Sequence, residues 1–267
     1  MIINHPTVSL IVSTYNWPQA LRLCLDSIIN QAIPPDEVII ADDGSTDETR
    51  ILIRKYQLDF PVPLIHVWQE DEGFQLSRIR NKAIARASKA YIVQVDGDLI
   101  LQKSFIKDHL AFSRPGSFVS GSRVIMNKEL STKLLKESSI NIKLTNKGLI
   151  NVANGLRIPF LSSRMANYRN KDVYYMRGCN MAFWRKDLIA VNGYNEAFEG
   201  WGREDNEIGL RLIHTGIEKR IIKFSGIVFH IYHPEKTRSG LNVNDELLKK
   251  TAQDKRTYCK KGLDQYL

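Results

Sequence analysis

Short apolar segments rich in Val and Ile alternate with amphipathic segments over the first hundred residues of this chain. The apolar segments are 8–13, 37–41, 64–68 and 91–95. Their length and their turn-forming flanks are typical of buried strands, and the segments between them have apolar residues at helical spacing. Strands that alternate with helices predict βαβ units, and so an α/β fold with a mainly parallel, Rossmann-like central sheet flanked by helices.

The second half of the chain has a less regular pattern. Between residues 127 and 172, polar residues and glycines interrupt the apolar spacing, which predicts loops and short helices. Beyond them the pattern predicts a helix that ends at Gly216, a pair of strands within 220–230 and a basic helix from Asn244. The 267 residues are enough for one large domain or two small ones, and no low-complexity linker divides them.

The formal net charge of +9 favours an anionic partner, such as a nucleotide sugar, a lipid-phosphate surface or a nucleic acid. The sequence contains no zinc-finger or RNA-recognition signature, so we expect no nucleic-acid partner. No apolar run approaches the ~20 residues that span a bilayer, and residues 1–6 do not have the pattern of a signal peptide. We therefore expect a cytoplasmic protein whose three cysteines are reduced.

Acidic residues follow two of the predicted strands. Asp42 and Asp43 come after the second strand, and Asp96 and Asp98 flank Gly97 after the fourth. Doubly wound sheets bind ligands at the carboxyl ends of their strands. There the second pair can share one hard divalent cation, such as Mg²⁺ or Mn²⁺, and the first pair can hold a ribose hydroxyl or a base N–H. The alternative is that both pairs only form tight turns before the next element.

A tryptophan between two glycines lies in the segment 199–207. The glycines make a flexible loop that presents Trp201, whose indole face suits stacking on a sugar. Glu204 and Asp205 then open a helix, and its dipole keeps a carboxylate ionised and able to accept a proton near neutral pH. The alternative is that these acidic residues only stabilise the helix N-terminus.

Histidines and arginines provide further candidates. His230 and His233 are three residues apart and so do not share one face of a strand, which leaves at most one of them to complete a metal site. Arg78 and Arg80 lie on the predicted helix before the fourth strand, and guanidinium groups suit phosphate. A solvated basic helix face is the alternative for either arginine.

Together these motifs resemble family 2 glycosyltransferases of the GT-A fold. The segments SLIVSTYN, DDGSTD, SRIRNKA and VDGD resemble the nucleotide-binding half of that family in order and spacing. The segments RGCNMAFWR, GYNEAFEGWGREDNE and FHIYH resemble the acceptor-binding half shared with β-1,4-galactosyltransferases and chondroitin-type polymerases. The resemblance implies a nucleotide-sugar-binding half at 1–126, an acceptor-binding and catalytic half of the same domain at 127–235, and a basic helical tail at 236–267.

The resemblance also implies roles for individual residues. Asp205 would be the general base, and Trp201 and Glu204 would bind the sugar substrate. Asp98 would ligate Mn²⁺ or Mg²⁺ together with His230, which matches the family's histidine ligand better than His233 does. The donor nucleotide and its phosphates would contact Thr14, Tyr15, Asp43, Arg78 and Asp96.

The implied function is inverting transfer of a hexose or N-acetylhexosamine from a UDP-sugar to a saccharide hydroxyl, in the synthesis of a bacterial surface polysaccharide or lipooligosaccharide. Two alternatives are a sugar nucleotidyltransferase and a catalytically weak nucleotide-sugar-binding protein. The first usually has a glycine-rich basic loop after its first strand, where this chain has residues 14–17, Thr-Tyr-Asn-Trp. The basic tail is expected to be a solvated helix, and the alternative, favoured by a lipid-linked acceptor, is a peripheral contact with the inner face of the membrane.

Overall fold

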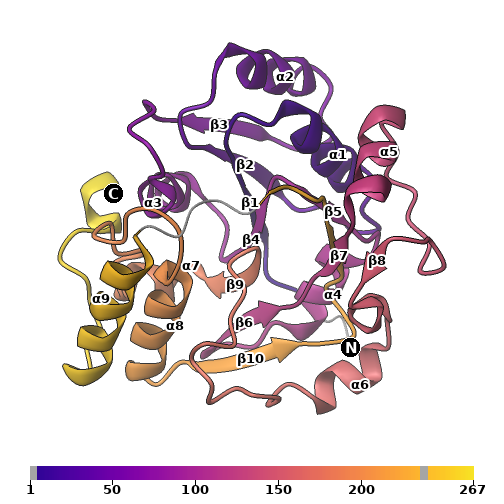
Figure 1. Cartoon of the computed structure of the whole chain (residues 1–267). Coiled ribbons are helices and arrows are strands. Elements are labelled where there is room, and N and C mark those ends of the chain that lie inside the picture. The colour runs from indigo at the N-terminus through magenta and orange to yellow at the C-terminus, as the bar shows by residue number, and fades with distance from the viewer. Residues whose placement is uncertain (1–4, 235–239) are drawn as a thin grey trace.

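A seven-stranded sheet forms the centre of the computed structural model, which describes residues 5–234 and 240–267 (Figure 1). The strands, in spatial order, are β10 (Glu218–Ile222), β6 (Ser117–Gly121), β9 (Asn180–Trp184), β4 (Tyr91–Asp96), β1 (Val8–Thr14), β2 (Glu37–Asp42) and β3 (Leu64–Trp68). Neighbouring strands are parallel, except that β9 runs antiparallel to both β4 and β6. The predicted mainly parallel α/β sheet is confirmed, and β1 to β4 are the four strands expected from the apolar segments.

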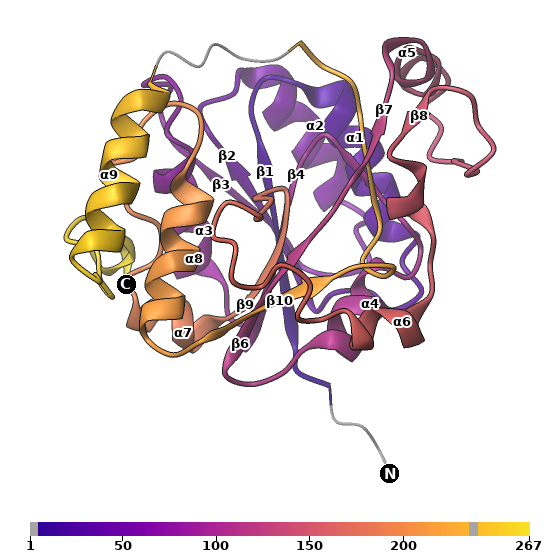
Figure 2. The same cartoon turned by 60° about the horizontal axis from the view of Figure 1, so that its bottom comes forward.

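Helices cover both faces of this sheet (Figure 2). They are α1 (Pro18–Ile29), α2 (Asp47–Gln57), α3 (Leu76–Arg86), α4 (Phe105–Phe112), α7 (Arg185–Ala190) and α8 (Glu204–His214). The core between the sheet and α1, α2 and α4 contains Leu10 and Val12 of β1, whereas Ile11 belongs to the core that faces α3, α7 and α8. Successive side chains of a strand point to opposite faces, so a strand covered on both sides is buried along its whole length and mostly apolar, as β1 is.

A second, smaller sheet lies beside the carboxyl ends of β1 and β4. Its strands, in spatial order, are β5 (Leu99–Leu101), β11 (Val228–His230), β7 (Val124–Met126) and β8 (Leu149–Ile150). The two strands predicted around 220–230 are present, but they do not pair with each other, because β10 pairs with β6 in the large sheet and β11 pairs with β5 and β7 in the small one. A turn through Phe224 and Gly226, both with positive φ, separates the two strands and leads β11 to the chain segment that follows Asp98.

The region 127–172 and the C-terminal tail contain the remaining helices: α5 (Lys128–Glu137), η1 (Val152–Gly155), α6 (Pro159–Arg164), α9 (Leu241–Gln253) and η2 (Leu263–Tyr266). The tail is only partly the expected basic helix. Two basic residues, Lys249 and Lys250, lie on α9 together with two acidic ones, and Lys255, Arg256, Lys260 and Lys261 follow its end. No helix in the described ranges is long and apolar enough to cross a membrane.

Candidate active site

A buried arginine contacts three carboxylates from different parts of the chain. Arg80 on α3 has a side chain that is 1% exposed, and its Nη1 donates to Asp205 Oδ1 at 2.9 Å and to Glu204 Oε1 at 3.5 Å. Its Nη2 donates to Asp96 Oδ1 at 3.2 Å. Burial lowers the pKa of Arg80, but the charges of these carboxylates outweigh it and hold the pKa above its usual value. One guanidinium thus orients three carboxylates that are far apart in the sequence.

The catalytic candidate Asp205 is held in a tight space at the start of α8. A Cβ added to Gly178 would lie 1.8 Å from Asp205 Oδ2, so a side chain at 178 and the observed carboxylate position exclude each other. The Tyr194 hydroxyl contacts Asp205 Oδ1 at 3.4 Å and also donates to Gln94 Oε1 at 2.9 Å. The carboxylate is therefore fixed by packing and by hydrogen bonds, as a positioned acid or base requires.

The neighbouring Glu204 has a different electrostatic environment. Burial, reinforced by the charge of Asp205, raises the pKa of Glu204 to about 8, against the opposing charge of Arg80. Its Oε2 is buried and has no hydrogen-bond partner among the described residues. A buried polar atom of this kind needs a partner, so the Oε2 position suits a hydroxyl group of a bound substrate.

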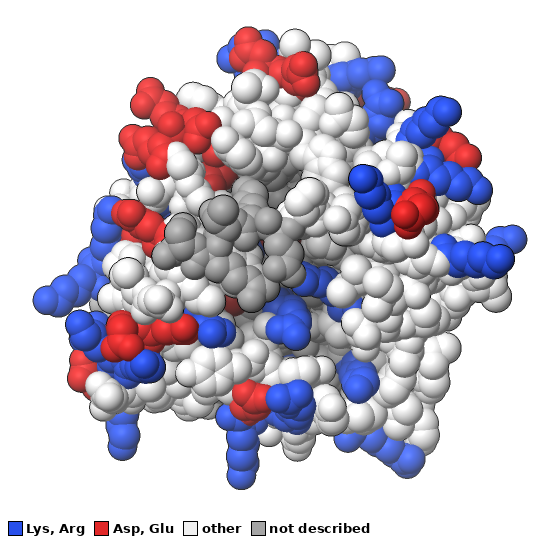
Figure 3. Space-filling view, in the orientation of Figure 1, with Lys and Arg blue, Asp and Glu red and all other residues white. Residues whose placement is uncertain are grey.

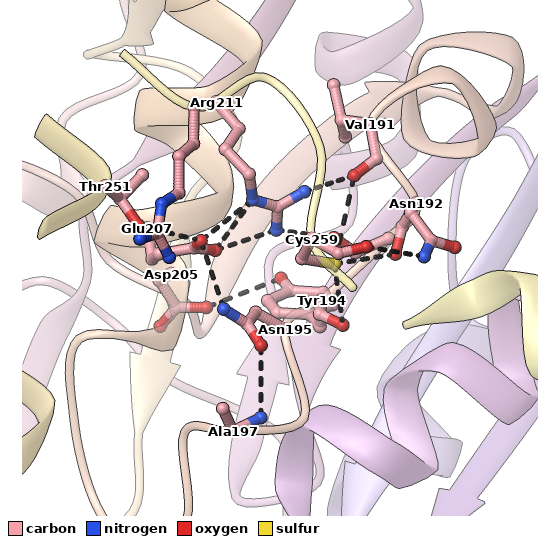
Figure 4. Close-up of polar contacts among 12 residues, drawn as sticks. Val191, Asn192, Tyr194, Asn195, Ala197, Asp205, Glu207, Arg211, Thr251 and Cys259 are labelled. Carbon is pink, nitrogen blue, oxygen red and sulfur yellow. Dashed lines mark hydrogen bonds and ion pairs between the residues drawn. The ribbon is translucent and has the colours of Figure 1, made fainter. Parts of the chain in front are cut away.

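A second ion pair lies behind Asp205, and Figure 4 shows it next to Tyr194. Arg211 and Glu207 of α8 are both buried and form an ion pair with an Nη2–Oε2 distance of 2.7 Å. Arg211 also donates to the carbonyls of Val191 and Gly193 (Nη2 to Gly193 O, 2.6 Å), which fixes the loop that leads to Tyr194. The pair stabilises the frame behind the site and does not face the carboxylate cluster.

The predicted metal ligands come together at the edge of the small sheet. Asp98, His230 and His233 offer ligand atoms that all lie within 4.8 Å of one another. Asp98 Oδ2 is 3.5 Å from His230 Nε2 and 3.3 Å from His233 Nε2. Asp98 Oδ1 is buried and unpaired within the described part of the chain. A carboxylate and two imidazoles that converge with a spare oxygen fit a divalent cation.

Both histidines lie beside Asp98, although the spacing predicted that at most one of them completes a metal site. That prediction assumed that both residues lie on one strand, but β11 ends at His230, and the chain beyond it no longer alternates. His233 packs edge-on against Trp17, with ring centroids 6.0 Å apart. Burial lowers the pKa of His230, whereas the hydrogen bond to Asp98 raises the pKa of His233.

The pair after β2 divides into a structural residue and a candidate binding residue. Asp42 is fully buried and binds His66 Nε2 at 2.9 Å and the Ser45 N–H at 2.9 Å. Asp43 lies one residue further along, where Gln69 Nε2 donates to its Oδ1 at 2.7 Å. Thr14 ends the adjacent strand β1, and the exposed Tyr15 follows it. The candidate nucleotide-binding residues therefore share one edge of the sheet.

The two candidate arginines of α3 have different surroundings. Arg78 is partly exposed and forms an ion pair with Glu72 at 2.6 Å, outside the carboxylate cluster that Arg80 joins. The sequence contains a signal that separates them, since Arg80 shares the buried helix face with Ser77 and Ile84 at positions i, i+3 and i+7. The sequence analysis did not single out Arg123, which lies between β6 and β7 and whose charge acts on Asp96 and Asp98.

The loop that carries Trp201 has an unusual backbone and contacts the C-terminal helix. Gly200, Gly202 and Arg203 all have positive φ, and Trp201 is 44% exposed. Asn244 of α9 is buried and donates from Nδ2 to Glu199 O at 3.1 Å and to Gly202 O at 2.9 Å. Arg203 Nε forms an ion pair with Asp245 Oδ1 at 2.5 Å. Helix α9 therefore holds both ends of the loop.

Two family models match the chain. The sequence model described as glycosyl transferase family 2 matches residues 9–191, and the one described as the N-terminal domain of galactosyltransferase matches residues 160–234. Chondroitin synthase from Escherichia coli is 26% identical over 264 residues, which cover 90% of this chain and 38% of that protein. The chain thus spans well under half the length of this relative.

Solved structures give the same fold. TarS from S. aureus, solved as residues 1–349 in complex with UDP-GlcNAc, has a TM-score of 0.66 and 17% identity, and the match covers 97% of this chain and 69% of that one. A mannosyltransferase from Pyrobaculum calidifontis, solved with GDP-Man and Mn²⁺, has a TM-score of 0.63 and 20% identity, over 95% and 65% of the two chains. At this identity the likeness establishes the GT-A fold.

Proposed function

Because the chain belongs to glycosyl transferase family 2, we propose that it transfers a hexose or N-acetylhexosamine from a UDP-sugar to a saccharide hydroxyl with inversion at the anomeric carbon. The observation that carries the proposal is the position of Asp205. Gly178, Arg80 and Tyr194 fix its carboxylate in the cluster that also contains Asp96, next to the Asp98 cation site. A base and a phosphate-side cation site that lie together are what a single displacement at a nucleotide sugar needs.

The donor nucleotide is proposed to lie along the carboxyl edge of β1, β2 and β4. Asp43 and Tyr15 would contact the uridine, Thr14 and Asp96 would lie beside the ribose and phosphates, and Arg78 would contribute positive charge. For Thr14, Tyr15, Asp43 and Asp96 this assignment is supported by their position at the carboxyl ends of neighbouring parallel strands, whereas Arg78 lies on α3. Of the two solved neighbours described above, one binds UDP-GlcNAc and the other GDP-Man, so the choice of base requires an experiment.

Asp98 and His230 are proposed to hold Mn²⁺ or Mg²⁺, and His233 is a further ligand candidate. The bound cation would neutralise negative charge on the leaving diphosphate. His230 suits this role because burial lowers its pKa and keeps its imidazole neutral, which is the form that binds a metal.

Asp205 is proposed to accept the proton of the acceptor hydroxyl as its oxygen attacks the anomeric carbon. Glu204 would bind a sugar hydroxyl and remain largely protonated at neutral pH, because its pKa is raised to about 8. Trp201 would stack on the sugar from the loop at the start of α8. The environments of the two adjacent acids thus separate their roles, with one serving as base and the other as a hydrogen-bonding group.

A donor screen tests the proposal. We expect UDP to be released from one or more UDP-sugars without acceptor when Mn²⁺ is present. Release should be lost with EDTA and should recover when Mn²⁺ is restored, because a cation held by Asp98 and the histidines would neutralise the charge of the leaving diphosphate. GDP-mannose is the control donor. Turnover of GDP-mannose alone would contradict the uridine assignment. A transferred sugar that keeps the donor's anomeric configuration by NMR would contradict inversion.

The alternatives of a nucleotidyltransferase and of a non-catalytic binding protein are not favoured. The family match covers residues 9–191, and Asp205, Asp98 and His230 are all present. A growing bacterial surface polysaccharide or lipooligosaccharide is the proposed acceptor, in line with chondroitin synthase among the relatives.

Substitution of Asn244 is expected to weaken acceptor binding selectively. Asn244→Ala leaves the carbonyls of Glu199 and Gly202 without their donor and loosens the loop that presents Trp201. We expect the acceptor KM to rise about tenfold, with little change in UDP release without acceptor. Gln253→Ala, an exposed position on the same helix, is the control. An equal loss in both assays would mean that Asn244 supports the whole site rather than the loop.

A further inference from the structure

One long segment of the chain is basic and free of acidic residues. Between Glu137 and Asp172 the sequence contains no Asp or Glu, whereas the rest of the chain mixes both charges. The basic residues of this segment are Lys143, Lys147, Arg157, Arg164, Arg169 and Lys171. The segment therefore has a local net charge of +6, which is a large share of the +9 of the whole chain.

The same segment exposes large apolar side chains. Leu156 and Ile158 are each 43% exposed and Phe160 is 68% exposed, and the five consecutive residues 156–160 are all exposed. Ile150 is 50% exposed on the edge strand β8. Single exposed apolar residues are ordinary, but a contiguous group of them marks an interaction surface.

Cations and aromatic rings lie together on this surface. The Arg164 guanidinium lies 4.1 Å from the ring centroid of Phe160, one turn away on α6. Lys223 Nζ lies 4.4 Å from the ring of Tyr168 and 5.7 Å from that of Phe224. In the region of α6, at the lower right of Figure 3, Lys and Arg lie among uncharged residues.

The surface is held in place by the rest of the fold. The Ile158 N–H donates to Phe224 O at 2.8 Å, and Arg157 pairs with the buried Asp108 at 2.6 Å. The exposed apolar residues are thus fixed outward beside positive charge.

We propose that this surface, formed by residues 150–168 with Lys223 and Phe224, binds an anionic lipid bilayer. Apolar side chains that enter the headgroup region next to Lys and Arg are the pattern of interfacial membrane binding. Each basic residue near the surface adds attraction to anionic lipid. A soluble acidic polysaccharide would use the charges but offers nothing to Ile158 and Phe160, and a second copy of this basic surface would be repelled.

The tail is less suited to a membrane than this surface. Helix α9 buries Leu248 against Phe198 and Leu210, so its apolar face already packs against the domain. Its Lys249 is paired with Glu246 at 2.6 Å. The 150–168 surface, in contrast, begins at strand β8 of the small sheet. In that sheet β8 pairs with β7, and β7 also pairs with β11, the strand that ends at His230. A lipid-linked acceptor would thus be presented on the side of the cation site, a consequence that rests on the proposed function.

Vesicle binding of the full chain tests the proposal without any activity measurement. We expect the protein to sediment with vesicles of phosphatidylcholine and phosphatidylglycerol but not with phosphatidylcholine alone. Ile158→Ser/Phe160→Ser and Arg164→Glu should each lower the partition coefficient about tenfold or more. Leu58→Ser/Arg54→Glu changes charge and apolar area at two exposed positions, one on α2 and one directly after it; it is the control and should bind like the parent chain. Circular dichroism checks that each variant is folded.

Three outcomes would overturn the proposal. The first is equal binding of the parent chain and the 158/160 variant to anionic vesicles. The second is loss of binding only in Lys260→Glu/Lys261→Glu, which would assign the contact to the tail. The third is that the parent chain does not bind vesicles at all. In that case, binding to a soluble polyanion or self-association through Phe160 in sedimentation velocity would identify the actual partner of the surface. Donor turnover remains measurable in every variant, so a failure here is separate from a failure of the proposed function.

Discussion

Asp205→Asn should lower kcat for sugar transfer by about a thousandfold, the scale expected when a positioned general base is lost. Asparagine has nearly the same shape and can still accept a hydrogen bond from Arg80, but it cannot take the proton of the acceptor hydroxyl. The donor KM should change little, because the nucleotide-binding candidates lie along β1 and β2. Initial-rate kinetics with varied donor and acceptor measure both effects.

A matched control separates chemistry from folding. Asp187 also lies in the first turn of a helix, α7, but away from the carboxylate cluster, so Asp187→Asn should leave kcat near that of the parent chain. Near-native transfer by a folded Asp205→Asn would contradict the base assignment. Gly178→Ala gives an independent route to the same defect, because its Cβ would displace the Asp205 carboxylate that it would meet at 1.8 Å; it should lower kcat although Asp205 is intact.

Strands β1, β2 and β4 of the central sheet were predictable because each has a recognisable pattern in its own short segment of sequence. β1, β2 and β4 are covered on both faces, so each is a short run dominated by apolar residues that differs from an amphipathic helix. The small sheet was not predictable, since β7 and β11 have three residues each and are defined by partners about a hundred residues away. Strands that short carry almost no pattern, and their pairing is a property of the folded chain.

The candidate site was predictable where function resides in a motif and not where it resides in packing. Asp98 and Asp205 stand in recognisable segments, and the structure places both near Asp96. Arg80 was weighed as a phosphate ligand or as part of a solvated helix face, because a sequence does not reveal that one buried cation contacts three carboxylates from distant elements. The role of Asn244 was equally hidden, since α9 contacts the Trp201 loop only after the tail folds back on α8.

Arg80→Met should destabilise the fold by about 3–5 kcal/mol, the cost of removing one partner from a buried ion pair. Methionine fills a similar volume but leaves Asp96, Glu204 and Asp205 around a site without positive charge. For a chain of this size the loss corresponds to a decrease in Tm of about 10 °C at pH 8. Thermal unfolding followed by circular dichroism measures it, with activity as a second readout that should also be lost.

Arg78→Met is the matched control, because Arg78 lies on the same helix with its partly exposed side chain paired to the exposed Glu72. Its loss should cost about 0–1 kcal/mol.

The Arg80 effect should also depend on pH. Burial raises the pKa of Asp96 to about 6 and that of Glu204 to about 8, and the charge of Arg80 opposes both shifts. Without the guanidinium these two pKa values rise further, so the variant gains stability from protonation at low pH and loses it as pH rises. The difference in Tm between the parent chain and Arg80→Met should therefore be smaller at pH 5.5 than at pH 8. Equal Tm losses for the two methionine variants, or a difference independent of pH, would mean that Arg80 does not balance the charge of the carboxylate cluster.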